Sequence, residues 1–269
     1  MRLRSIAVLF GSLFFATHAG AAPCGGDFNA FLSAMARDAA AAGVSRSVID
    51  SAFAGVTLDA AVLAFDRRQR GTFRKSFEEY AATRVSAPRL KRARALMQRH
   101  AALLARIENQ YGVPRTLLMA IWTLESDNGT GDMGRLPVIR TIATLAHDCR
   151  RTELFQRELI AALQIVQRGD LPLRDLIGAY AGEIGQTQFL PSSYIKYGVD
   201  YDGNGHVDLR HSIPDVLAST ANLLKTNGWQ AGAPFTAGTP NFEVAMREWN
   251  HSEVYRKTIV LMAQRLGGG

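Results

Sequence analysis

The chain has 269 residues, of which 47% are hydrophobic, and a formal net charge of +7 at pH 7. This is enough to bury a sizeable core as one large domain or two closely packed lobes, and the modestly basic balance suits an anionic polymer without specifying which one. The six histidines form no HExxH pair, no serine lies in a GxSxG elbow and no glycine loop ends in Lys-Ser/Thr, so zinc hydrolases, serine esterases and P-loop enzymes lack their minimum parts.

Residues 1–22 have the features of a cleavable secretory leader. Arg2 and Arg4 precede an apolar stretch from Ile6 to Ala16, and small residues lead up to Ala22. We expect the mature chain to begin near Ala22, which removes two positive charges and takes the formal charge from +7 to +5. The leader predicts export to the periplasm or beyond, and export argues against a nucleic-acid partner.

Two cysteines, Cys24 and Cys149, remain after the leader. In an oxidising compartment they can form a disulfide that ties the N-terminus to the core and stabilises the fold by about 2 to 5 kcal/mol, but the sequence leaves open whether they meet. A metal site made of two distant cysteines without histidine partners is less favoured. Pro23 argues against a lipid anchor on Cys24, because the acceptor cysteine of a lipoprotein follows a small residue. No later apolar run approaches the ~18 residues of a membrane span.

The apolar residues that follow the leader recur at helical spacing. Asp27 can cap a helix that begins at Phe28, and Gly43 stops this helix. A basic run, DRRQRGTF at 66–73, either lines a groove for an anionic substrate or forms a solvated loop. Strand-like alternation is scarce, so the fold is predicted to be mainly α. Besides the helix described next, we expect helices at about 28–42, 45–53, 58–65, 88–110, 137–148, 152–168, 172–179, 190–197, 213–227 and 250–266.

The stretch 111–129 is the most informative part of the chain. Pro114 suits a first helical turn, and the apolar residues after it cover most of the helix circumference, which is typical of a buried helix. Glu125 ends this run, as the only ionisable side chain between Arg115 and Asp127, where the helix opens into a glycine-containing loop. A carboxylic acid held against apolar walls resists ionisation and can serve as a general acid, whereas a solvated Glu at a fraying helix end would not.

A second polar segment, AYAGEIGQTQFLPSSY at 179–194, is rich in glycine and amide side chains. Gln186 and Gln188 offer donors and acceptors suited to sugar hydroxyls and acetamido groups, and Phe189 can support a sugar face. The alternative is a structural loop whose serines cap helices. Glu183 is the second candidate acid, and its polar loop predicts an ionised carboxylate in a hydrogen-bonding or charge-stabilising role. Asp127 is third and is expected to cap its loop.

Residues 200–215 begin like an EF-hand calcium loop. Oxygen ligands would come from positions 1, 3, 5 and 9 and a backbone carbonyl from position 7. Position 12 is His211 in place of a bidentate Glu, so a standard loop would lose its strongest ligand, and a hairpin turn explains the DGNG sequence equally well. The candidate ligands are Asp200, Asp202, Asn204, His206, Asp208 and, a little farther on, Asp215.

Three motifs, in this order, resemble one known family. They are YGVP at 111–114, the Glu125 and Ser126 pair that closes an apolar helix, and GEIGQTQFLPSSY at 182–194. Together they resemble the MltB-type soluble lytic murein transglycosylases of bacteria, over nearly all of the chain after the leader. The resemblance implies a lysozyme-like core (goose-type, SLT) with an N-terminal helical extension, and peptidoglycan glycan strands as the substrate.

The resemblance also implies roles for individual residues. Glu125 becomes the single catalytic acid/base, and Asp215 would close a lengthened calcium loop with a structural role. Gln188 and Phe189 fall on the QF of the family's GQF-P-S-S pattern and become groove residues, while Leu223 stands where the family has a tyrosine, which removes one hydrogen bond. The residues expected to contact substrate are Ser126, Glu183, Gln186, Gln188, Phe189, Trp249, Asn250 and Tyr255.

The last three of these residues resemble the family's aromatic-Asn-x(4)-Tyr signature. Asn250 could hold an acetamido group or orient Glu125, and Tyr255 could help to fix the acid. For Trp249 and Tyr255, packing of a last helix against the core is an equally good explanation.

The expected chemistry departs from that of most glycosidases, which use two carboxyl groups. With Glu125 alone, the resemblance implies that the sugar's own O6 attacks the anomeric carbon, so a 1,6-anhydromuramic end forms and no water is consumed. The same Glu would first donate and then accept a proton. Two rival functions remain: a muramidase, in which a second carboxylate activates water, and a wall-binding scaffold that has lost turnover. No cofactor is required for the chemistry, and structural Ca²⁺ is the metal expected.

These observations predict a division of the chain into three parts. Residues 1–22 form the signal peptide, 23–110 an N-terminal helical region packed on the core, and 111–269 the lysozyme-like catalytic core with the calcium-type loop at 200–215. The expected protein is a periplasmic monomer that binds peptidoglycan, with cell-wall synthesis proteins as candidate partners and no nucleic acid.

Overall fold

The computed structural model describes residues 22–69 and 75–268, and within them the chain is mainly α, as predicted. Two short strands, β1 and β2, pair antiparallel with Leu136 opposite Gly178. The elements are α1 (Phe28–Ala41), α2 (Arg46–Phe53), α3 (Ala60–Arg68), α4 (Phe77–Arg84), α5 (Ala87–Arg99), α6 (Ala101–Tyr111), α7 (Arg115–Ser126), β1 (Leu136–Pro137), α8 (Val138–His147), α9 (Thr152–Arg168), a 3-10 turn (Leu173–Asp175), β2 (Ile177–Gly178), α10 (Pro191–Tyr197), α11 (Ile213–Thr226), α12 (Pro240–Trp249) and α13 (Glu253–Gly267).

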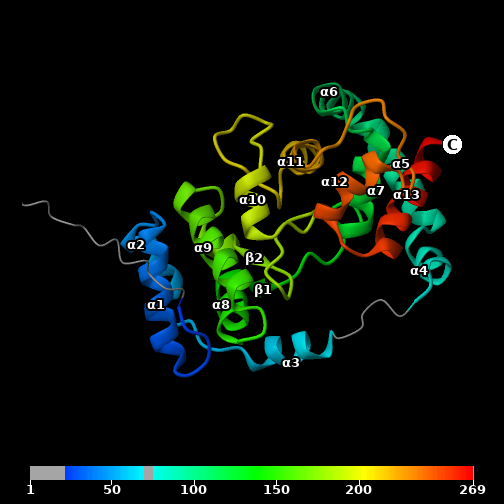
Figure 1. Ribbon diagram of the computed structural model, residues 1–269. Helices are drawn as coiled ribbons and strands as arrows, with labels where there is room; N and C mark the ends of the chain where they lie inside the picture. Colours follow the sequence, from blue (N-terminus) through cyan, green and yellow to red (C-terminus); the bar gives the residue numbers. More distant parts are fainter. Residues whose placement is uncertain (1–21, 70–74, 269) are drawn as a thin grey trace, which may run out of the picture.

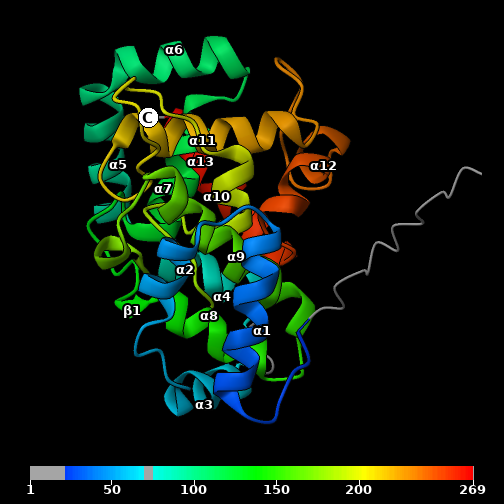
Figure 2. The same cartoon turned by 90° about the vertical axis from the view of Figure 1, so that its left-hand side faces the viewer.

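The helices form two groups (Figure 1). In the first, α1, α2, α3 and α10 pack on α8 and α9. In the second, α4, α5, α6 and α11 pack with α7 and α13, and α12 packs on α11. Contacts between α10 and α11 join the groups. Figure 2 shows α6 and α3 at opposite ends of the molecule. The helices before residue 111 therefore divide between the two groups, α1 to α3 in one and α4 to α6 in the other.

Helix α7 lies at the centre of the second group. Every residue from Leu117 to Leu124 is buried, as the sequence predicted for this helix. Burial of each large apolar side chain contributes about 1.5 to 3 kcal/mol relative to exposure. The helix begins after Pro114 and ends at Asp127, which has the left-handed conformation with φ 52°. Asp127 also pairs with Arg92 on α5, so an ion pair as well as packing holds this end of α7.

Two of the predicted helices were wrong in detail. The expected single helix at 88–110 is broken at His100, whose φ of −102° and ψ of 21° separate α5 from α6. The expected helix at 172–179 is a single 3-10 turn followed by β2. Gly178 explains this difference, because a Cβ there would lie 2.1 Å from the backbone oxygen of Glu183, so the chain at this point approaches another strand-like segment closely.

Two helices were not predicted. Helix α4 has a weak apolar pattern but a capping box, in which Ser76 and Glu79 each accept a hydrogen bond from the other's backbone N–H. Helix α12 begins with Pro240, which suits a first helical turn, and it ends at Trp249. Both helices pack on the second group, and α4 lies against α13.

The start of the described chain is tied to the first group. Cys24 and Cys149 form a disulfide, and Gly25 N–H donates to the carbonyl oxygen of His147 at 2.9 Å. Cys149 lies in the short connection between α8 and α9, so the disulfide fixes this connection to the start of the described chain. The predicted signal peptide, 1–22, lies outside the described residues apart from its last residue, and among the described helices none has the length and apolar character needed to cross a membrane.

Candidate active site

Glu125 lies in the last turn of α7, where α12 and α13 approach that helix. The indole Nε1 of Trp249, at the end of α12, donates to Glu125 Oε1 at 3.1 Å. The hydroxyl of Tyr255, in the first turn of α13, donates to the same oxygen at 2.6 Å. Both hydrogen bonds that described side chains donate to this carboxyl therefore end on Oε1, which leaves Oε2 as the oxygen that can exchange a proton.

The surroundings of Glu125 make it a much weaker acid than an ordinary Glu. Burial raises the pKa of Glu125 from 4.5 to about 7, because the charged form loses its hydration. The hydrogen bonds from Tyr255 and Trp249 lower this pKa, and the negative charge of Glu183 raises it. Near neutral pH both protonation states are therefore populated, which is the condition for one group to donate a proton and later accept one.

The same environment keeps Tyr255 protonated. Burial raises the pKa of Tyr255 well above its ordinary value, and the nearby Glu125 raises it further, because a phenolate would lie beside a carboxylate. The hydroxyl therefore keeps its proton and donates it in the hydrogen bond to Glu125 Oε1, which orients the carboxyl.

Glu125 borders a pocket of about 390 Å³ between the two helix groups. The second group contributes Trp249, Asn250 and Leu223, and the first group faces them with residues of α9, α10 and the 179–190 segment. The walls combine aromatic and aliphatic faces with a few polar groups. Such a mixture suits a sugar ring, which presents both C–H faces and hydroxyls.

Several residues that the sequence singled out lie in this pocket. Gln188 and Phe189 line it, and the Phe189 ring contacts the Trp249 ring edge to face with centroids 5.7 Å apart. Phe189 is only 3% exposed, so it supports the Trp249 platform more than it presents a face of its own. Asn250 also lines the pocket, and its Oδ1 accepts the Ser252 N–H at 2.8 Å, which leaves the amide N–H₂ as the end available to a ligand.

Two predicted contact residues point elsewhere. Gln186 is 7% exposed, and it accepts from Trp122 Nε1 at 2.8 Å and donates to the Arg210 carbonyl at 2.8 Å, so its amide is engaged inside the protein. Ser126 is buried, and its Oγ accepts the Gly129 N–H at 2.9 Å, so it caps the turn after α7. We correct the assignment of both residues, which stabilise the loops around the pocket and do not line it. Tyr255 does not line the pocket either, and it contacts Glu125 from behind.

The environment of Glu183 was also predicted incorrectly. The polar sequence around it suggested a solvated, ionised carboxylate, but burial raises the pKa of Glu183 above its ordinary value. Its Oε2 accepts the Ala181 N–H at 3.0 Å, and the positive charge of Arg151 partly counteracts the effect of burial. Glu183 lines the same pocket as Glu125, so the site contains two carboxyl groups with perturbed pKa values.

Sequence reasoning missed part of the pocket wall. Arg151, Tyr180, Ser193 and Glu248 line it as well. Tyr180 and Ser193 belong to the segment already chosen for its polarity, so proximity in the sequence could have identified them. Arg151 immediately precedes α9 and Glu248 lies on α12, and the sequence carries no local signal that would place either of them in the pocket wall with Glu125.

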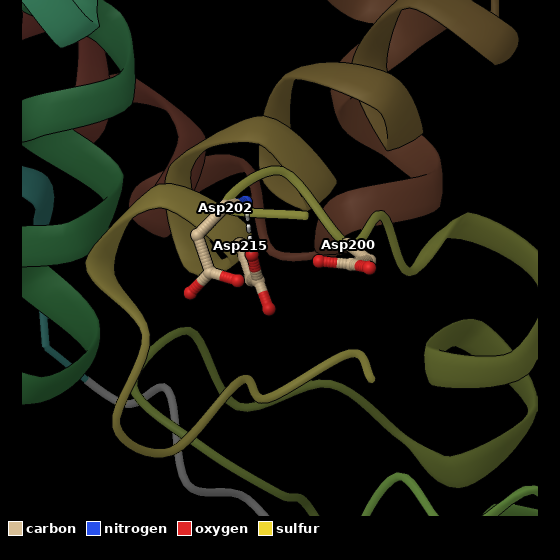
Figure 3. Close-up of side chains that lie close together, drawn as sticks. All are labelled: Asp200, Asp202 and Asp215. Carbon is tan, nitrogen blue, oxygen red and sulfur yellow. Dashed lines mark hydrogen bonds between the residues drawn. The ribbon is translucent and has the colours of Figure 1, made fainter. Parts of the chain in front are cut away.

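The acidic loop forms a separate cluster at the start of α11. The carboxylates of Asp200, Asp202 and Asp215 converge, with one oxygen from each lying within 4.8 Å of the others (Figure 3). Asp215 is fully buried and accepts the N–H groups of Tyr201 and Asp208 at 2.8 and 2.9 Å, and burial raises its pKa.

The other predicted ligands of this loop have different contacts. Asp208 Oδ1 accepts the N–H groups of Arg210 and His211, and its Oδ2 contacts His211 Nδ1 at 2.9 Å. Asn204 Oδ1 accepts the His206 N–H at 2.9 Å. The loop is thus held by side chain to backbone hydrogen bonds, with three carboxylates gathered at one point.

The fold is mainly α and lysozyme-like, with a half-buried carboxylic acid at the end of its central helix, and this combination defines the class of the protein. Sequence comparison identifies the family. The model of the transglycosylase SLT domain matches residues 27–238, and the chain belongs to this family. The membrane-bound lytic murein transglycosylase B of Escherichia coli (strain K12) is 39% identical over 124 residues, which are 45% of this chain and 34% of that protein. The match thus spans about a third of the length of that relative.

Solved structures share the fold over most of the chain. SltB3 from Pseudomonas aeruginosa, in complex with NAG-anhNAM-pentapeptide, superposes with a TM-score of 0.82 and 32% identity over 91% of this chain and 80% of that chain. SltB1 from Pseudomonas aeruginosa, a soluble lytic transglycosylase, has a TM-score of 0.79 and 25% identity over 90% of this chain and 98% of that chain. The predicted resemblance to MltB-type lytic transglycosylases and the predicted lysozyme-like fold are confirmed.

Proposed function

We propose that this protein is a periplasmic lytic transglycosylase that cleaves the β-1,4 bond between N-acetylmuramic acid and N-acetylglucosamine in peptidoglycan. One observation carries the proposal: the pocket contains a carboxylic acid, Glu125, whose pKa burial raises to about 7 and whose Oε1 is held by two donors. Two of the relatives named above, that of Escherichia coli and SltB1, are lytic transglycosylases, and SltB3 was crystallised with a NAG-anhNAM-pentapeptide.

In the first step the protonated Glu125 donates its proton to the glycosidic oxygen. The bond between that oxygen and the anomeric carbon breaks, and positive charge develops on the sugar ring. Trp249 and Tyr255 both donate to Oε1, so they stabilise the carboxylate that this transfer leaves behind. These two hydrogen bonds strengthen as negative charge develops on the carboxylate. They therefore stabilise the transition state more than the ground state, which accelerates the reaction.

In the second step the sugar's own O6 attacks the anomeric carbon and gives its proton to Glu125. The product is a 1,6-anhydromuramic end, and the acid returns to its starting state without consuming water. Shielding of the carboxyl favours this outcome because few water molecules compete with O6. The Phe189-supported ring of Trp249 and the free amide N–H₂ of Asn250 border the space where the sugar would lie.

Glu183 gives the rival hydrolytic function a specific basis. A muramidase requires a second carboxylate that activates water, and Glu183 lines the same pocket. The two functions differ in their products, since a hydrolase leaves reducing ends and a transglycosylase leaves anhydro ends.

The decisive experiment is digestion of purified sacculi followed by mass analysis of the released fragments. Wild type, Glu125→Gln and Glu183→Gln are compared, with Glu253→Gln as the matched control, because Glu253 is exposed on α13 and Lys257 is its ion-pair partner among the described residues. We expect anhydro ends from wild type and control, and a loss of about 100-fold or more in rate for Glu125→Gln. Reducing ends that depend on Glu183 would support the muramidase, and no lysis by wild type would support a wall-binding scaffold.

The acidic loop supports a structural calcium ion as part of this proposal. Three converging carboxylates supply the hard oxygen ligands that Ca²⁺ prefers, and Asp215 fills the place left by His211. Asp208 is not one of these three carboxylates, so the ligand set would differ from that of a standard EF-hand loop. The ion would link the start of α11 to the loop after α10, away from Glu125.

The calcium proposal is tested by thermal unfolding with Ca²⁺ and with a chelator. We expect Ca²⁺ to raise the melting temperature of wild type and to have no effect on Asp215→Asn, because binding to the folded state alone is stabilising. Equal melting temperatures for wild type in Ca²⁺ and in chelator would contradict it.

A further inference from the structure

Helix α3 places a buried carboxylate behind one wall of the pocket. Asp66, near the end of α3, is 5% exposed and forms ion pairs with two consecutive arginines. Its Oδ1 accepts from Arg151 Nη2, and its Oδ2 accepts from Arg150 Nη2. Since each oxygen serves one guanidinium, Asp66 fixes the positions of the two arginines relative to each other and to α3.

Of these two arginines, only Arg151 lines the pocket. Its guanidinium carbon lies 4.8 Å from the centroid of the Phe155 ring, and 44% of its side chain is exposed. The guanidinium is thus held by Asp66 and by the Phe155 ring but keeps open N–H groups. Five donors in a planar fork are available to an arginine, and Asp66 uses one of its nitrogens.

The ion pairs around this site neutralise Arg150 more completely than Arg151. Arg150 pairs with both Asp66 and Asp148, and Arg67 also pairs with Asp148. Arg151 has only its share of Asp66. On the pocket side the positive charge of Arg151 lowers the pKa of Glu183. Among the described residues, however, no ion pair joins the Arg151 and Glu183 side chains. An anionic ligand in the pocket would find an oriented, partly desolvated guanidinium.

A second contact from α3 reaches the same wall. The ring of Phe65, the residue before Asp66, packs edge to face on Tyr180 with centroids 4.6 Å apart, and Tyr180 lines the pocket. Neighbouring residues of α3 therefore support two pocket residues that come from distant parts of the chain. The basic run at 66–73 was predicted either to line a groove or to be a solvated loop. Residues 66–69 of this run are described by the structure. Among them Asp66 neither lines the pocket nor lies in a solvated loop, because it is buried and contacts a pocket residue from the side away from the pocket.

We propose that Asp66 is a positioning residue, which presents the Arg151 guanidinium to a carboxylate of the peptide stem carried by the glycan substrate. The proposal rests on the proposed function for the identity of the ligand. The pocket should therefore bind peptide-bearing strands more tightly than bare glycan. This preference should depend on α3, a helix far from Glu125 in the sequence. Without Asp66, Arg151 would retain its charge but lose its fixed direction, and the preference would decline.

The test measures binding and not turnover, so that it can fail separately from the proposed function. All proteins carry Glu125→Gln, and the ligands are short glycan fragments with and without peptide stems, titrated by calorimetry. The variants are Asp66→Asn, Arg151→Gln, both together, and Asp148→Asn as the matched control, since Asp148 belongs to the same ion-pair cluster but does not touch Arg151.

We expect Asp66→Asn and Arg151→Gln each to weaken binding of peptide-bearing fragments by about tenfold or more, as for loss of a charge-assisted hydrogen bond, and to leave binding of bare fragments unchanged. The double variant should bind no more weakly than Arg151→Gln alone, because Asp66 acts through Arg151. Asp148→Asn should retain the preference.

Equal loss of both ligands, no loss with Asp66→Asn, or additive losses in the double variant would each overturn the proposal. If Asp66→Asn does not fold, Arg151→Gln decides, since a loss shared equally by both ligands contradicts a carboxylate contact at Arg151. A failure of the proposed function would appear differently, as the absence of lysis by wild type in the sacculus assay.

Discussion

Glu125→Gln should make the protein more stable at alkaline pH while removing its activity. Gln is nearly the same size as Glu, and its Oε1 can accept the same hydrogen bonds from Trp249 and Tyr255. The substitution therefore preserves the contacts of the side chain and removes only its ability to ionise. Any change in stability then reports the cost of holding a carboxyl group in this pocket.

The sign and size of this effect follow from the pKa of Glu125. Burial raises that pKa from 4.5 to about 7 in the folded protein, so between these pH values the folded state binds more protons than the unfolded state. Stability therefore falls as pH rises through this window, and the whole cost is present above pH 7. The difference between 4.5 and about 7 corresponds to about 3 kcal/mol, and solvent in the adjoining pocket reduces it to roughly 1 to 3 kcal/mol.

Thermal unfolding of wild type and Glu125→Gln at several pH values tests this reasoning. For a protein of this size we expect the variant to melt about 3 to 10 °C higher at pH 8, and the two proteins to melt together at pH 4. A variant that is less stable than wild type at pH 8, or a difference that does not change with pH, would refute the claim that burial raises the pKa of this carboxyl.

Three further predictions concern the acid and the disulfide. Tyr255→Phe removes a hydrogen bond that lowers the pKa of Glu125, so the alkaline limb of the pH–rate profile should move to higher pH while kcat falls about tenfold or more; an unchanged profile would count against this contact. Glu183→Gln removes a negative charge that raises the same pKa, so the limb should move to lower pH, and a shift in the other direction would contradict the assignment. Replacing Cys24 and Cys149 by Ser should lower the free energy of unfolding in urea by about 2 to 5 kcal/mol, and an unchanged midpoint would show that the bridge adds no stability.

The central helix could be predicted because its sequence carries the whole signal. A helix that is apolar on most of its circumference, as from Leu117 to Leu124, is buried in a water-soluble domain. Glu125 is the first ionisable residue after this stretch. The raised pKa of Glu125 follows from that position. The identity of its donors does not, because Trp249 and Tyr255 reach it from α12 and α13, and α12 was not predicted at all.

The glycine and amide segment shows where local reasoning stops. Gln186 and Gln188 look equivalent in the sequence, yet one is engaged inside the protein and the other lines the pocket. The difference depends on the pairing of Ile184 with Phe189 and on the close approach of Gly185 to the Leu209 carbonyl, where a Cβ would lie at 2.2 Å. Both contacts join residues that local sequence patterns do not pair, so they could not be predicted from the sequence of this segment.

The most direct test of the chemistry is digestion of sacculi in water labelled with heavy oxygen. If Glu125 acts alone and the sugar's O6 completes the reaction, the muramic ends released by wild type will carry no label and will be lighter than reducing ends by one water. Ends that contain heavy oxygen would mean that water had attacked the anomeric carbon, and this result would contradict a single acid/base that serves both halves of the reaction.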